Sequence, residues 1–306
     1  MYYLAERLES MMESYVKSIN IKGALMSLET PKVMGILNAT PDSFYSGSRV
    51  ADRESVARRV RQMVDEGVDI FDVGGYSTRP GCTDISPEEE YSRLSGALEV
   101  IRKHAPEIPV SVDTFRADVA RRCVEDWQVD IINDIGGGTL DPEMFDTVAD
   151  LDVAYILMHI KGTPATMGNF TDYEDVVAEV LSDLAFKVAE LRRKKVRDVI
   201  VDPGFGFAKT VEQNYQLLAS LDSFHLTGSP VLAGLSRKTM IWKPLGITAA
   251  DAANGTTVLN TAALLNGADI LRVHDVRNAK EAVKLTELVR NGATDNNRVI
   301  RKFANV

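Results

Sequence analysis

Two basic residues near the end of the sequence could bind an anion together. Arg272 and His274 follow a short apolar run and are two positions apart, so both would point to the same side of a β-strand. A guanidinium and an imidazole buried side by side need a negatively charged partner, because a lone charge is costly to remove from water. The alternative interpretation is an Arg paired with a carboxylate of the protein, beside a His with satisfied hydrogen bonds.

Three hydrogen-bonding side chains, those of Asp113, Asn133 and Asp202, each end a short apolar run. A carboxylate can accept two parallel N–H bonds, and the amidine-like edge of a flat heterocycle offers such a pair. The Asn amide supplies both a donor and an acceptor. Together they predict a site that binds the edge of a heterocycle, with capping of nearby loops as the alternative. Paired carboxylates could also hydrolyse a glycoside, although that reaction would not need the basic residues.

Eight short apolar runs, each followed by a helical stretch, must position these residues. Near-continuous runs of Val, Ile and Leu are typical of parallel strands covered on both faces. Eight of them, alternating with helices, predict an α/β protein with a (β/α)8 barrel, or TIM barrel, whose active site lies at the carboxyl ends of the strands. An open doubly wound sheet is the alternative, but no Gly-x-Gly-x-x-Gly follows the first run. The runs are 33–38, 69–75, 110–113, 130–134, 155–159, 199–202, 231–234 and 270–274.

The segment Gly234-Leu-Ser-Arg-Lys238 would follow the seventh strand of this barrel. Phosphate sites in such barrels are frequently built by the loops after strands seven and eight. Ser236, Arg237 and Lys238, together with the Arg and His of strand eight, therefore predict a site for phosphate or pyrophosphate. A solvated Arg–Lys pair is the alternative.

Two long loops would lie at the same end of the barrel. The segment 38–44 follows the first strand and the segment 74–81 follows the second, and both exceed the usual length of about two to six residues. Long loops at this end are commonly lids or binding loops. The segment 202–207 carries two Phe rings that could stack on a flat ligand or pack within the loop. Met158 could line the floor of the site, with His159 in a structural role.

The composition is that of an ordinary globular protein, with 45% apolar and 26% charged residues. No apolar stretch approaches the roughly 18 residues of a membrane helix, and the first residues do not form a secretory signal, so we expect a cytoplasmic protein that does not contact a membrane. The net charge of −9 argues against nucleic-acid binding, which needs a basic face, but a local basic cluster can bind an anionic small molecule. Cys82 and Cys123 have no metal-type spacing and are expected to be free thiols.

The barrel is expected to occupy residues 33–290, with an extension at each end. Residues 1–32 are predicted to form an N-terminal helical extension, which could cover the floor of the barrel or contact a partner subunit. That prediction depends on apolar residues at helical spacing, namely Leu4, Leu8, Met11, Met12, Tyr15 and Ile19. Residues 291–306 are predicted to be a polar C-terminal tail that frays. Gly67 and Gly267 lie where two helices should end in the left-handed conformation.

Taken together, the eight strand ends resemble those of the dihydropteroate synthase family. The resemblance runs from about Val33 to Val289, nearly the whole predicted barrel. Any one motif could mislead, but all of them occur in order and each lies at a predicted strand end. The motifs are Gly-Ile-Leu-Asn38-Ala-Thr-Pro-Asp-Ser-Phe, Asp-Val-Gly-Gly-Tyr-Ser-Thr78-Arg79-Pro-Gly, Ser-Val-Asp113-Thr, Ile-Asn133-Asp-Ile, Leu-Met158-His-Ile-Lys-Gly-Thr-Pro, Asp202-Pro-Gly-Phe-Gly-Phe207, Gly-Leu-Ser236-Arg-Lys238 and Arg272-Val-His274-Asp.

The resemblance implies an enzyme of folate synthesis with two small-molecule substrates. Members of this family condense the pyrophosphate ester of 6-hydroxymethyl-7,8-dihydropterin with p-aminobenzoate, which gives 7,8-dihydropteroate and pyrophosphate. The resemblance also implies Mg²⁺ as a cofactor, a homodimer formed through the later helices, and sulfonamides as competitors of p-aminobenzoate.

Residue roles carry over where the motifs match, and the resemblance implies three binding sites and a catalytic set. The pterin would be held by Asp113, Asn133, Met158, Asp202, Phe207 and Lys238. The pyrophosphate would be held by Asn38, Arg79, Arg272 and His274, and Asn38 would also bind Mg²⁺. The p-aminobenzoate pocket would contain Thr78, Arg79, Pro80, Phe207, Ser236 and Lys238. Catalysis would depend on Asp113, Lys238, Arg272 and His274.

Two loop residues depart from the family pattern: Ser46 stands where an Asp is common, and Tyr76 stands where a Glu is common. Neither belongs to the expected pterin or anion sites. A pterin-binding methyltransferase domain is the first alternative; it would share the Asp and Asn residues but would not need the basic residues at 236–238 and 272–274. A non-catalytic pterin-binding barrel is the second, and the retention of every anion-binding residue weighs against it.

Overall fold

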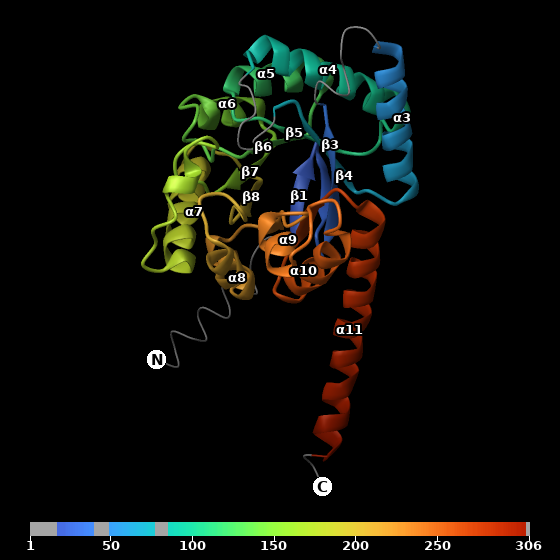
Figure 1. Cartoon of the computed structure of the whole chain (residues 1–306), viewed down its shortest axis with the longest axis vertical. Helices are drawn as coiled ribbons and strands as arrows, with labels where there is room; N and C mark the ends of the chain where they lie inside the picture. Colours follow the sequence, from blue (N-terminus) through green and yellow to red (C-terminus); the bar gives the residue numbers. More distant parts are fainter. Residues whose placement is uncertain (1–16, 40–48, 77–84, 304–306) are drawn as a thin grey trace.

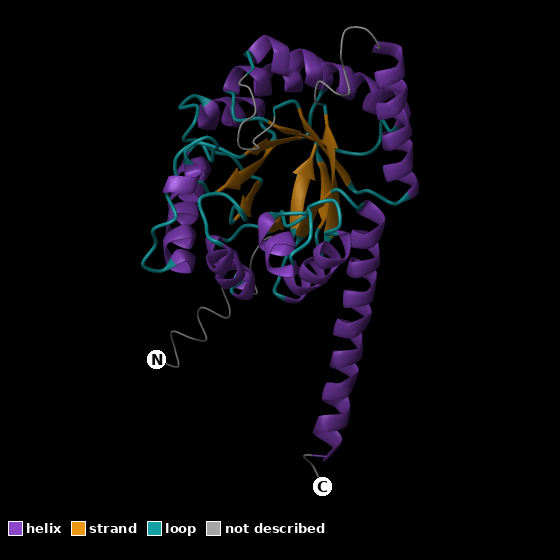
Figure 2. Cartoon of the chain, in the orientation of Figure 1, coloured by secondary structure: helices purple, strands orange, loops and turns teal. Residues whose placement is uncertain are grey.

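Eight parallel strands form a closed barrel at the centre of the structure (Figure 2). The computed structural model describes the backbone of residues 17–39, 49–76 and 85–303, and the side chains of all of these except 49–52 and 293–303. The strands are β3 (Lys32–Asn38), β4 (Ile70–Gly74), β5 (Val110–Asp113), β6 (Ile131–Asp134), β7 (Ala154–Met158), β8 (Val199–Asp202), β9 (Leu232–Ala233) and β10 (Ile270–Val273). They pair in the order β8-β7-β6-β5-β4-β3-β10-β9, and a parallel bridge between Val201 and Val231 closes the ring. The predicted (β/α)8 barrel is confirmed.

Helices follow the strands in turn and surround the barrel (Figure 1). They are α3 (Arg49–Asp65), α4 (Pro87–His104), α5 (Ala117–Trp127), α6 (Met144–Leu151), α7 (Val176–Arg193), α8 (Val211–Ala219), α9 (Thr239–Leu245), α10 (Ala253–Leu265) and α11 (Val276–Phe303). The start of α4 is set by Ser86, whose side chain accepts a bond from the N–H of Glu89. Gly67 and Gly267 have φ values of 84° and 94°, so the predicted left-handed conformation is confirmed at both.

Alternation along each strand separates the residues that face the helices from those that fill the barrel. On β4, Phe71 and Val73 belong to the core between the strands and the helices, whereas Ile70 belongs to a second core inside the barrel. The next inward position is Asp72, which is fully buried, and Gly74 follows at the end of the strand. The interior is therefore apolar towards the amino ends of the strands and polar towards their carboxyl ends.

A β-hairpin covers the floor of the barrel, where the sequence predicted a helix. Its strands, β1 (Ser18–Ile21) and β2 (Ala24–Ser27), pair antiparallel. The turn holds Lys22 and Gly23 at φ values of 50° and 84°, as a two-residue hairpin turn requires. Ile19 and Leu28 pack into the core inside the barrel. This turn and the burial on the floor outweigh the helical spacing, so the predicted helix is wrong for these strands; residues 1–16 lie outside the described part of the chain.

The last helix, α11, continues away from the barrel (Figure 1). It runs to Phe303, so the predicted frayed tail after residue 290 is wrong for the backbone as far as this residue. Gly292 does not end the helix, because one glycine costs only about 1 kcal/mol relative to Ala in a helix, and no Pro follows it. Neither α11 nor any other helix in the described part of the chain has a segment apolar enough to cross a membrane.

Candidate active site

The carboxyl end of the barrel holds an ion-paired cluster centred on Arg272. Its Nε donates to Asp72 Oδ2 at 2.6 Å, and its Nη2 donates to Asp113 Oδ2 at 2.5 Å. Arg272 comes from β10, Asp72 from β4 and Asp113 from β5, so the guanidinium reaches across the intervening β3. The Arg that the sequence assigned to an anion therefore lies inside the barrel, and it has the carboxylate partners of the alternative interpretation.

Two Asn side chains extend this cluster to neighbouring strands. Asn133 Nδ2 donates to Asp72, at 3.2 Å from Oδ2 and 3.4 Å from Oδ1. Strand register places Asn38, Gly74, Asp113 and Asn133 side by side at the ends of four adjacent strands. A Cβ atom added to Gly74 would lie 3.9 Å from both Asn38 Oδ1 and Asp113 Oδ2. These two oxygens therefore face the same space above Gly74.

Asp202 and Lys238 lie on another side of the barrel mouth. Asp202 ends β8, four strands from β4 in the closed barrel. A Cβ atom added to Gly234 would lie 3.7 Å from both Asp202 Oδ2 and Lys238 Nζ, so the carboxylate and the ammonium converge beside this glycine. Lys238 Nζ also donates to the carbonyl of Phe205 and lies 4.9 Å from the centroid of the Phe207 ring.

Burial has the largest single effect on the pKa of each of these side chains. It raises the pKa of Asp113 to about 7, against the opposing effect of Arg272. It also raises the pKa of Asp202, partly offset by Lys238, and it lowers the pKa of Lys238 to about 8. For Arg272, burial favours loss of the proton, but Asp72 and Asp113 outweigh burial and raise the pKa above its ordinary value. Shifted carboxyl and ammonium groups that meet in this way are typical of functional sites.

An apolar wall borders the polar cluster. Met158 packs with Ile135 and Ile160, and the cluster is extended by the partly buried Phe115, Met167 and Phe207. Met158 and Phe207 were predicted as ligand contacts from the sequence, whereas the other members were not. A signal was available, because Phe115, Ile135 and Ile160 each lie two positions after Asp113, Asn133 or Met158 and so share their side of the chain.

Ser236 and His274 form a hydrogen-bonded pair between the loops after β9 and β10. The Ser236 hydroxyl lies 2.9 Å from Nδ1 of His274 and accepts the His274 backbone N–H at 3.2 Å. Arg59, on α3, donates to the carbonyl of His274. The structure therefore brings both predicted residues together and fixes the backbone that carries the imidazole.

Arg237 does not belong to the anion site that the sequence predicted. Its guanidinium donates from Nε and Nη2 to both oxygens of Asp275, at 3.0 Å each, and from Nη1 to the carbonyls of Ala249 and Ala250. A φ of 56° at Arg237 turns the side chain away from the direction of its neighbours. The prediction was wrong because sequence spacing does not reveal this local turn, and the solvated Arg–Lys pair of the alternative is not seen either.

Asp72 is a polar residue of the cluster that sequence reasoning missed. It lies inside the second apolar run, two positions before the Gly that ends the strand. The available signal was an Asp at an inward position of an otherwise apolar strand, because a buried carboxylate needs a partner.

Lys209 is a second buried residue near the site that was not predicted from the sequence. Its buried ammonium lies 3.0 Å from Nδ1 of His159 and donates to the carbonyls of Gly204 and Phe207 at 3.1 and 2.9 Å. Burial lowers the pKa of Lys209 to about 7 and that of His159 to about 2, so the imidazole is neutral. The two residues hold together the loop that follows Asp202, which agrees with the structural role expected for His159.

Several predicted residues lie outside the described part of the chain: Thr78, Arg79, Pro80, Ser46 and Cys82. Tyr76, just before this gap, packs its ring edge-on against Phe115, with centroids 5.2 Å apart. Cys123 is buried and free, as expected.

Asn38 is the predicted metal ligand, and its side chain is exposed at the end of β3. Among the described residues, no group of three or more His, Cys, Asp or Glu side chains could hold a metal. One neutral amide oxygen fits an ion that keeps several waters and binds mainly through substrate phosphates, as Mg²⁺ does. The residues present therefore fit a Mg²⁺ ion carried by a phosphate ester.

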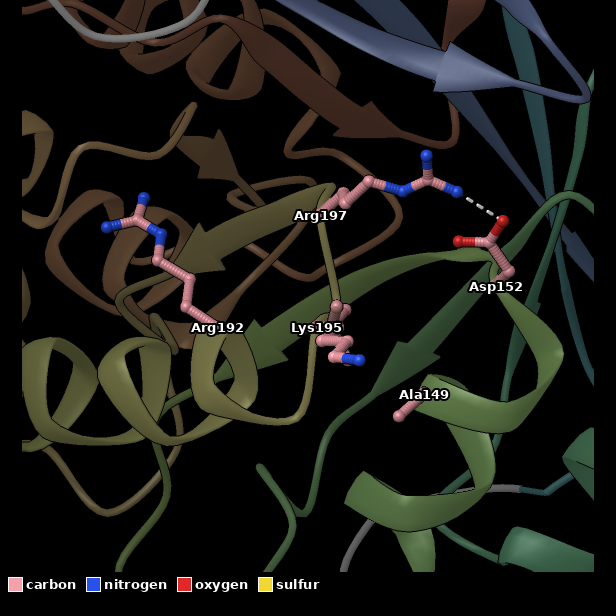
Figure 3. A pocket seen from close by; sticks show the side chains of 6 residues that line it. Ala149, Asp152, Arg192, Lys195 and Arg197 are labelled. Carbon is pink, nitrogen blue, oxygen red and sulfur yellow. Dashed lines mark hydrogen bonds and ion pairs between the residues drawn. The ribbon is translucent and has the colours of Figure 1, made fainter.

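A cavity of about 650 Å³ lies at the other end of the barrel (Figure 3). It lies between the end of α6 and the loop that leads from α7 to β8, and Arg197 pairs there with Asp152. Its lining residues are Ala149, Asp152, Arg192, Lys195, Val196 and Arg197. This cavity contains none of the residues of the polar cluster, so it is separate from the candidate site.

Comparisons with known proteins cover the same segments. A family model described as "Pterin binding enzyme" matches residues 34–274. The dihydropteroate synthase of Synechocystis sp. is 40% identical over 258 residues, which cover 83% of this chain and 89% of that protein. The mitochondrial folate synthesis bifunctional protein of Arabidopsis thaliana is 40% identical over 272 residues, which cover 83% of this chain and 49% of that protein. This chain therefore spans about half the length of the Arabidopsis protein.

Solved structures agree with the sequence matches. The crystal structure of Yersinia pestis dihydropteroate synthase in a sulfonamide complex superposes with a TM-score of 0.83 at 32% identity. The match covers 90% of this chain and 99% of that chain. From the shared motifs, the barrel and these matches we conclude that the chain belongs to the dihydropteroate synthase family of pterin-binding enzymes.

Proposed function

We propose that this chain condenses the pyrophosphate ester of 6-hydroxymethyl-7,8-dihydropterin with p-aminobenzoate in the synthesis of folate. The products are 7,8-dihydropteroate and pyrophosphate. The observation that carries the proposal is the ion pair between Arg272 and Asp113, because it joins a group suited to pyrophosphate to a group suited to ring N–H donors. Membership of the dihydropteroate synthase family supports the same reaction.

The pterin would place its polar edge against Asp113, Asn133 and Asp202. A carboxylate accepts paired N–H bonds, and the Asn amide adds a donor and an acceptor. The apolar wall that contains Met158 supplies a surface for the face of the ring, and Phe207 borders the same wall. Lys238 lies beside Asp202 and would donate to an acceptor on the ring.

The bond that breaks joins the methylene carbon of the pterin to the ester oxygen of the pyrophosphate. The pyrophosphate leaves with the bonding electrons, so negative charge grows on it while positive charge grows on the pterin. Arg272 and His274 would bind the leaving group through N–H donors placed in advance. Ionised Asp113 would stabilise the positive charge, because the attraction between opposite charges is strong at short range in a dry site.

The amine of p-aminobenzoate then forms the new C–N bond with its lone pair and releases one proton to solvent. An arylamine is already a nucleophile, so the reaction needs no strong general base. Phe207, Ser236 and Lys238 would line its pocket, together with loop residues Thr78, Arg79 and Pro80.

Mg²⁺ is the proposed cofactor, with Asn38 as its protein ligand. When bound, the ion would neutralise part of the charge on the pyrophosphate. The support for this assignment is the exposed amide of Asn38, whose oxygen faces the same space as the Asp113 carboxyl.

The proposed assembly is a homodimer through the face formed by α10 and α11. These two helices pack against each other, and they carry large apolar side chains that are more than half exposed: Val258, Leu265, Leu285, Leu288 and Val289. Large apolar side chains exposed on two neighbouring helices suit a protein–protein interface. We also propose that the protein works in the cytoplasm, where a free thiol such as Cys123 stays reduced.

The reaction is tested by incubating the purified protein with both substrates and Mg²⁺ and measuring dihydropteroate by mass spectrometry. Product formation that rises with enzyme concentration is expected. No product at high enzyme concentration would overturn the proposal, and retained pterin binding in that case would favour the non-catalytic barrel. Methyl transfer from methyltetrahydrofolate would favour the methyltransferase domain, a function that does not need Arg272 and His274 to bind pyrophosphate.

A further inference from the structure

Asp72 is a buried carboxylate that substrate cannot reach. It occupies the inward position of β4 below Gly74, and its side chain has no solvent exposure. A carboxylate in this position can act on a bound ligand only through the side chains around it. Its contacts therefore decide what it does.

These contacts join two groups that belong to different halves of the candidate site. Asp72 Oδ2 accepts Nε of Arg272 at 2.6 Å. The same carboxylate accepts Nδ2 of Asn133, at 3.2 Å to Oδ2 and 3.4 Å to Oδ1. Arg272 is the candidate ligand of the pyrophosphate, and Asn133 is the candidate ligand of the pterin edge. One carboxylate thus fixes a donor for each half of the first substrate.

The two carboxylates around Arg272 leave a defined part of its guanidinium open. Asp72 takes Nε and Asp113 takes Nη2, whereas Nη1 has no hydrogen-bond acceptor among the described residues. The guanidinium is planar, so holding two of its nitrogens also fixes the direction of the third. An incoming anion would meet Nη1 in a fixed orientation.

We propose that Asp72 is a positioning residue that holds Arg272 away from full pairing with Asp113, so that Asp113 keeps one oxygen for the pterin. This inference rests on the proposed function. A guanidinium and a lone carboxylate prefer a bidentate pair that uses both carboxylate oxygens. Asp113 would be the remaining carboxylate bonded to Arg272 if Asp72 lost its charge, and the pair would then occupy the oxygens that the ring needs.

The test compares the wild type with Asp72→Asn, Arg272→Gln and the double variant. Asp72→Asn is expected to lower kcat/KM for the pterin pyrophosphate about 10- to 100-fold, the range that loss of an orienting partner produces. The KM for p-aminobenzoate should stay within about twofold, a split that a general loss of folding would not produce. An amide at this position can still accept Nδ2 of Asn133, so Asp72→Asn chiefly removes the ion pair with Arg272. Adding it to Arg272→Gln should therefore cause little further loss.

Ser111→Ala is the matched control. Ser111 is paired in register with Asp72 on the next strand and is fully buried. Its hydroxyl has no hydrogen-bond partner among the described residues, so the variant alters a polar group at the same level of the barrel without touching Arg272. Its kinetics should stay within about twofold of the wild type.

Three results would overturn the inference: Asp72→Asn with wild-type kinetics, losses that multiply in the double variant, or an equal loss in Ser111→Ala.

If Asp72→Asn alone does not fold, as circular dichroism would show, the double variant provides the test, because it removes both charges and is still compared with Arg272→Gln. If the wild type makes no product, the proposed function fails, and the same set of variants is measured by calorimetry with inorganic pyrophosphate and 6-hydroxymethylpterin. There, weaker binding of 6-hydroxymethylpterin by Asp72→Asn is expected, because Arg272 would occupy the Asp113 oxygen that the ring needs. Unchanged pterin binding overturns the inference separately.

Discussion

Arg272 donates to Asp113 at 2.5 Å, so the candidate ligand of the anion and the candidate ligand of the ring form one ion-paired unit before any substrate binds. Each residue therefore sets the charge and the orientation of the other. A substrate that carries both a pyrophosphate and a pterin would engage the two members of this unit at once.

Arg272→Gln should reduce stability and activity together. It leaves Asp72 and Asp113 buried without their cation, and breaking a buried ion pair by removing one partner costs about 3–5 kcal/mol. The measurement is urea unfolding followed by circular dichroism. Arg53→Gln is the control, because Arg53 pairs with Glu99 at the surface and exposed pairs contribute only about 0–1 kcal/mol. Equal losses in the two variants would contradict the prediction.

The rate should depend on pH through Asp113 and Lys238. Burial raises the pKa of Asp113 to about 7, so kcat/KM for the pterin pyrophosphate should rise as pH passes 7 and the ionised form becomes available. Burial lowers the pKa of Lys238 to about 8, so the rate should fall as pH passes 8 and the ammonium loses its proton. The expected profile is a bell with a narrow maximum between these values.

Lys238→Arg separates the two limbs of this profile. A guanidinium stays charged throughout the range, so the fall above pH 8 should disappear while the rise near pH 7 remains. The expected rate at the maximum is lower, because an Arg cannot copy the contacts of the Lys238 ammonium with Phe205 and Phe207. A fall that persists at the same pH would assign the alkaline limb to another group.

Stability should also depend on the pKa of Asp113. The folded state holds this proton up to about pH 7, whereas an Asp in the unfolded chain loses it near pH 4. Between these values the folded state binds more protons than the unfolded state. The contribution of Asp113 to the free energy of unfolding should therefore fall as pH rises from 4 to 7. This pH-dependent contribution should be absent in Asp113→Asn. Urea unfolding curves of both proteins between pH 4 and 7 would show the difference.

Lys209→Met should loosen the loop that carries Phe207. It leaves Nδ1 of His159 and two loop carbonyls without their donor, and each buried unsatisfied group costs about 1–3 kcal/mol. We expect a lower melting temperature and a higher Kd for the pterin. Lys161→Met is the control, since Lys161 pairs with Glu179 at the surface, and its melting temperature should change little. A wild-type Kd in Lys209→Met would show that the loop does not depend on this ammonium.

Leu288→Glu should weaken the proposed dimer. Leu288 is more than half exposed on α11, and a charge placed in an apolar interface must be desolvated when two copies associate. Light scattering with size-exclusion chromatography should show a dimer for the wild type and a larger share of monomer for the variant. Phe186→Glu, on α7, is the control, because Phe186 is also more than half exposed, and α7 lies on the side of the barrel away from α11 (Figure 1). A monomeric wild type would contradict the proposed homodimer.

The sequence predicted the barrel because its strands are nearly continuous apolar runs, and the polar residue that ends a run marks the mouth. The rule succeeds for Asp113, Asn133 and Asp202, which lie at or near strand ends inside the barrel. It fails for Asp72, which lies one inward position below the end of its strand. Arg237 shows the opposite failure, because its position in a basic motif could not reveal that a left-handed turn directs it to Asp275.

The two ends of the chain were predicted less well than the barrel. Helical spacing predicted a helix as far as Ile19, but the turn at Lys22 and Gly23 folds residues 18–27 into a hairpin, and Ile19 packs into the core inside the barrel. At the other end, polar residues after Val289 were taken as a sign of fraying, although nothing in them stops a helix. On the barrel floor the decisive contribution is burial against the inner core, which local residue type does not encode.

The hairpin on the barrel floor has a consequence for the charges at the opposite end. Ile19 and Leu28 belong to the apolar core that lies beneath the polar cluster, so this core separates Asp72 and Arg272 from the solvent below the barrel. The hairpin thus helps to keep the effective dielectric constant around these charges low, which strengthens the attraction between them. A substitution that opened the floor would weaken the ion pairs from below, although it would touch no residue of the site.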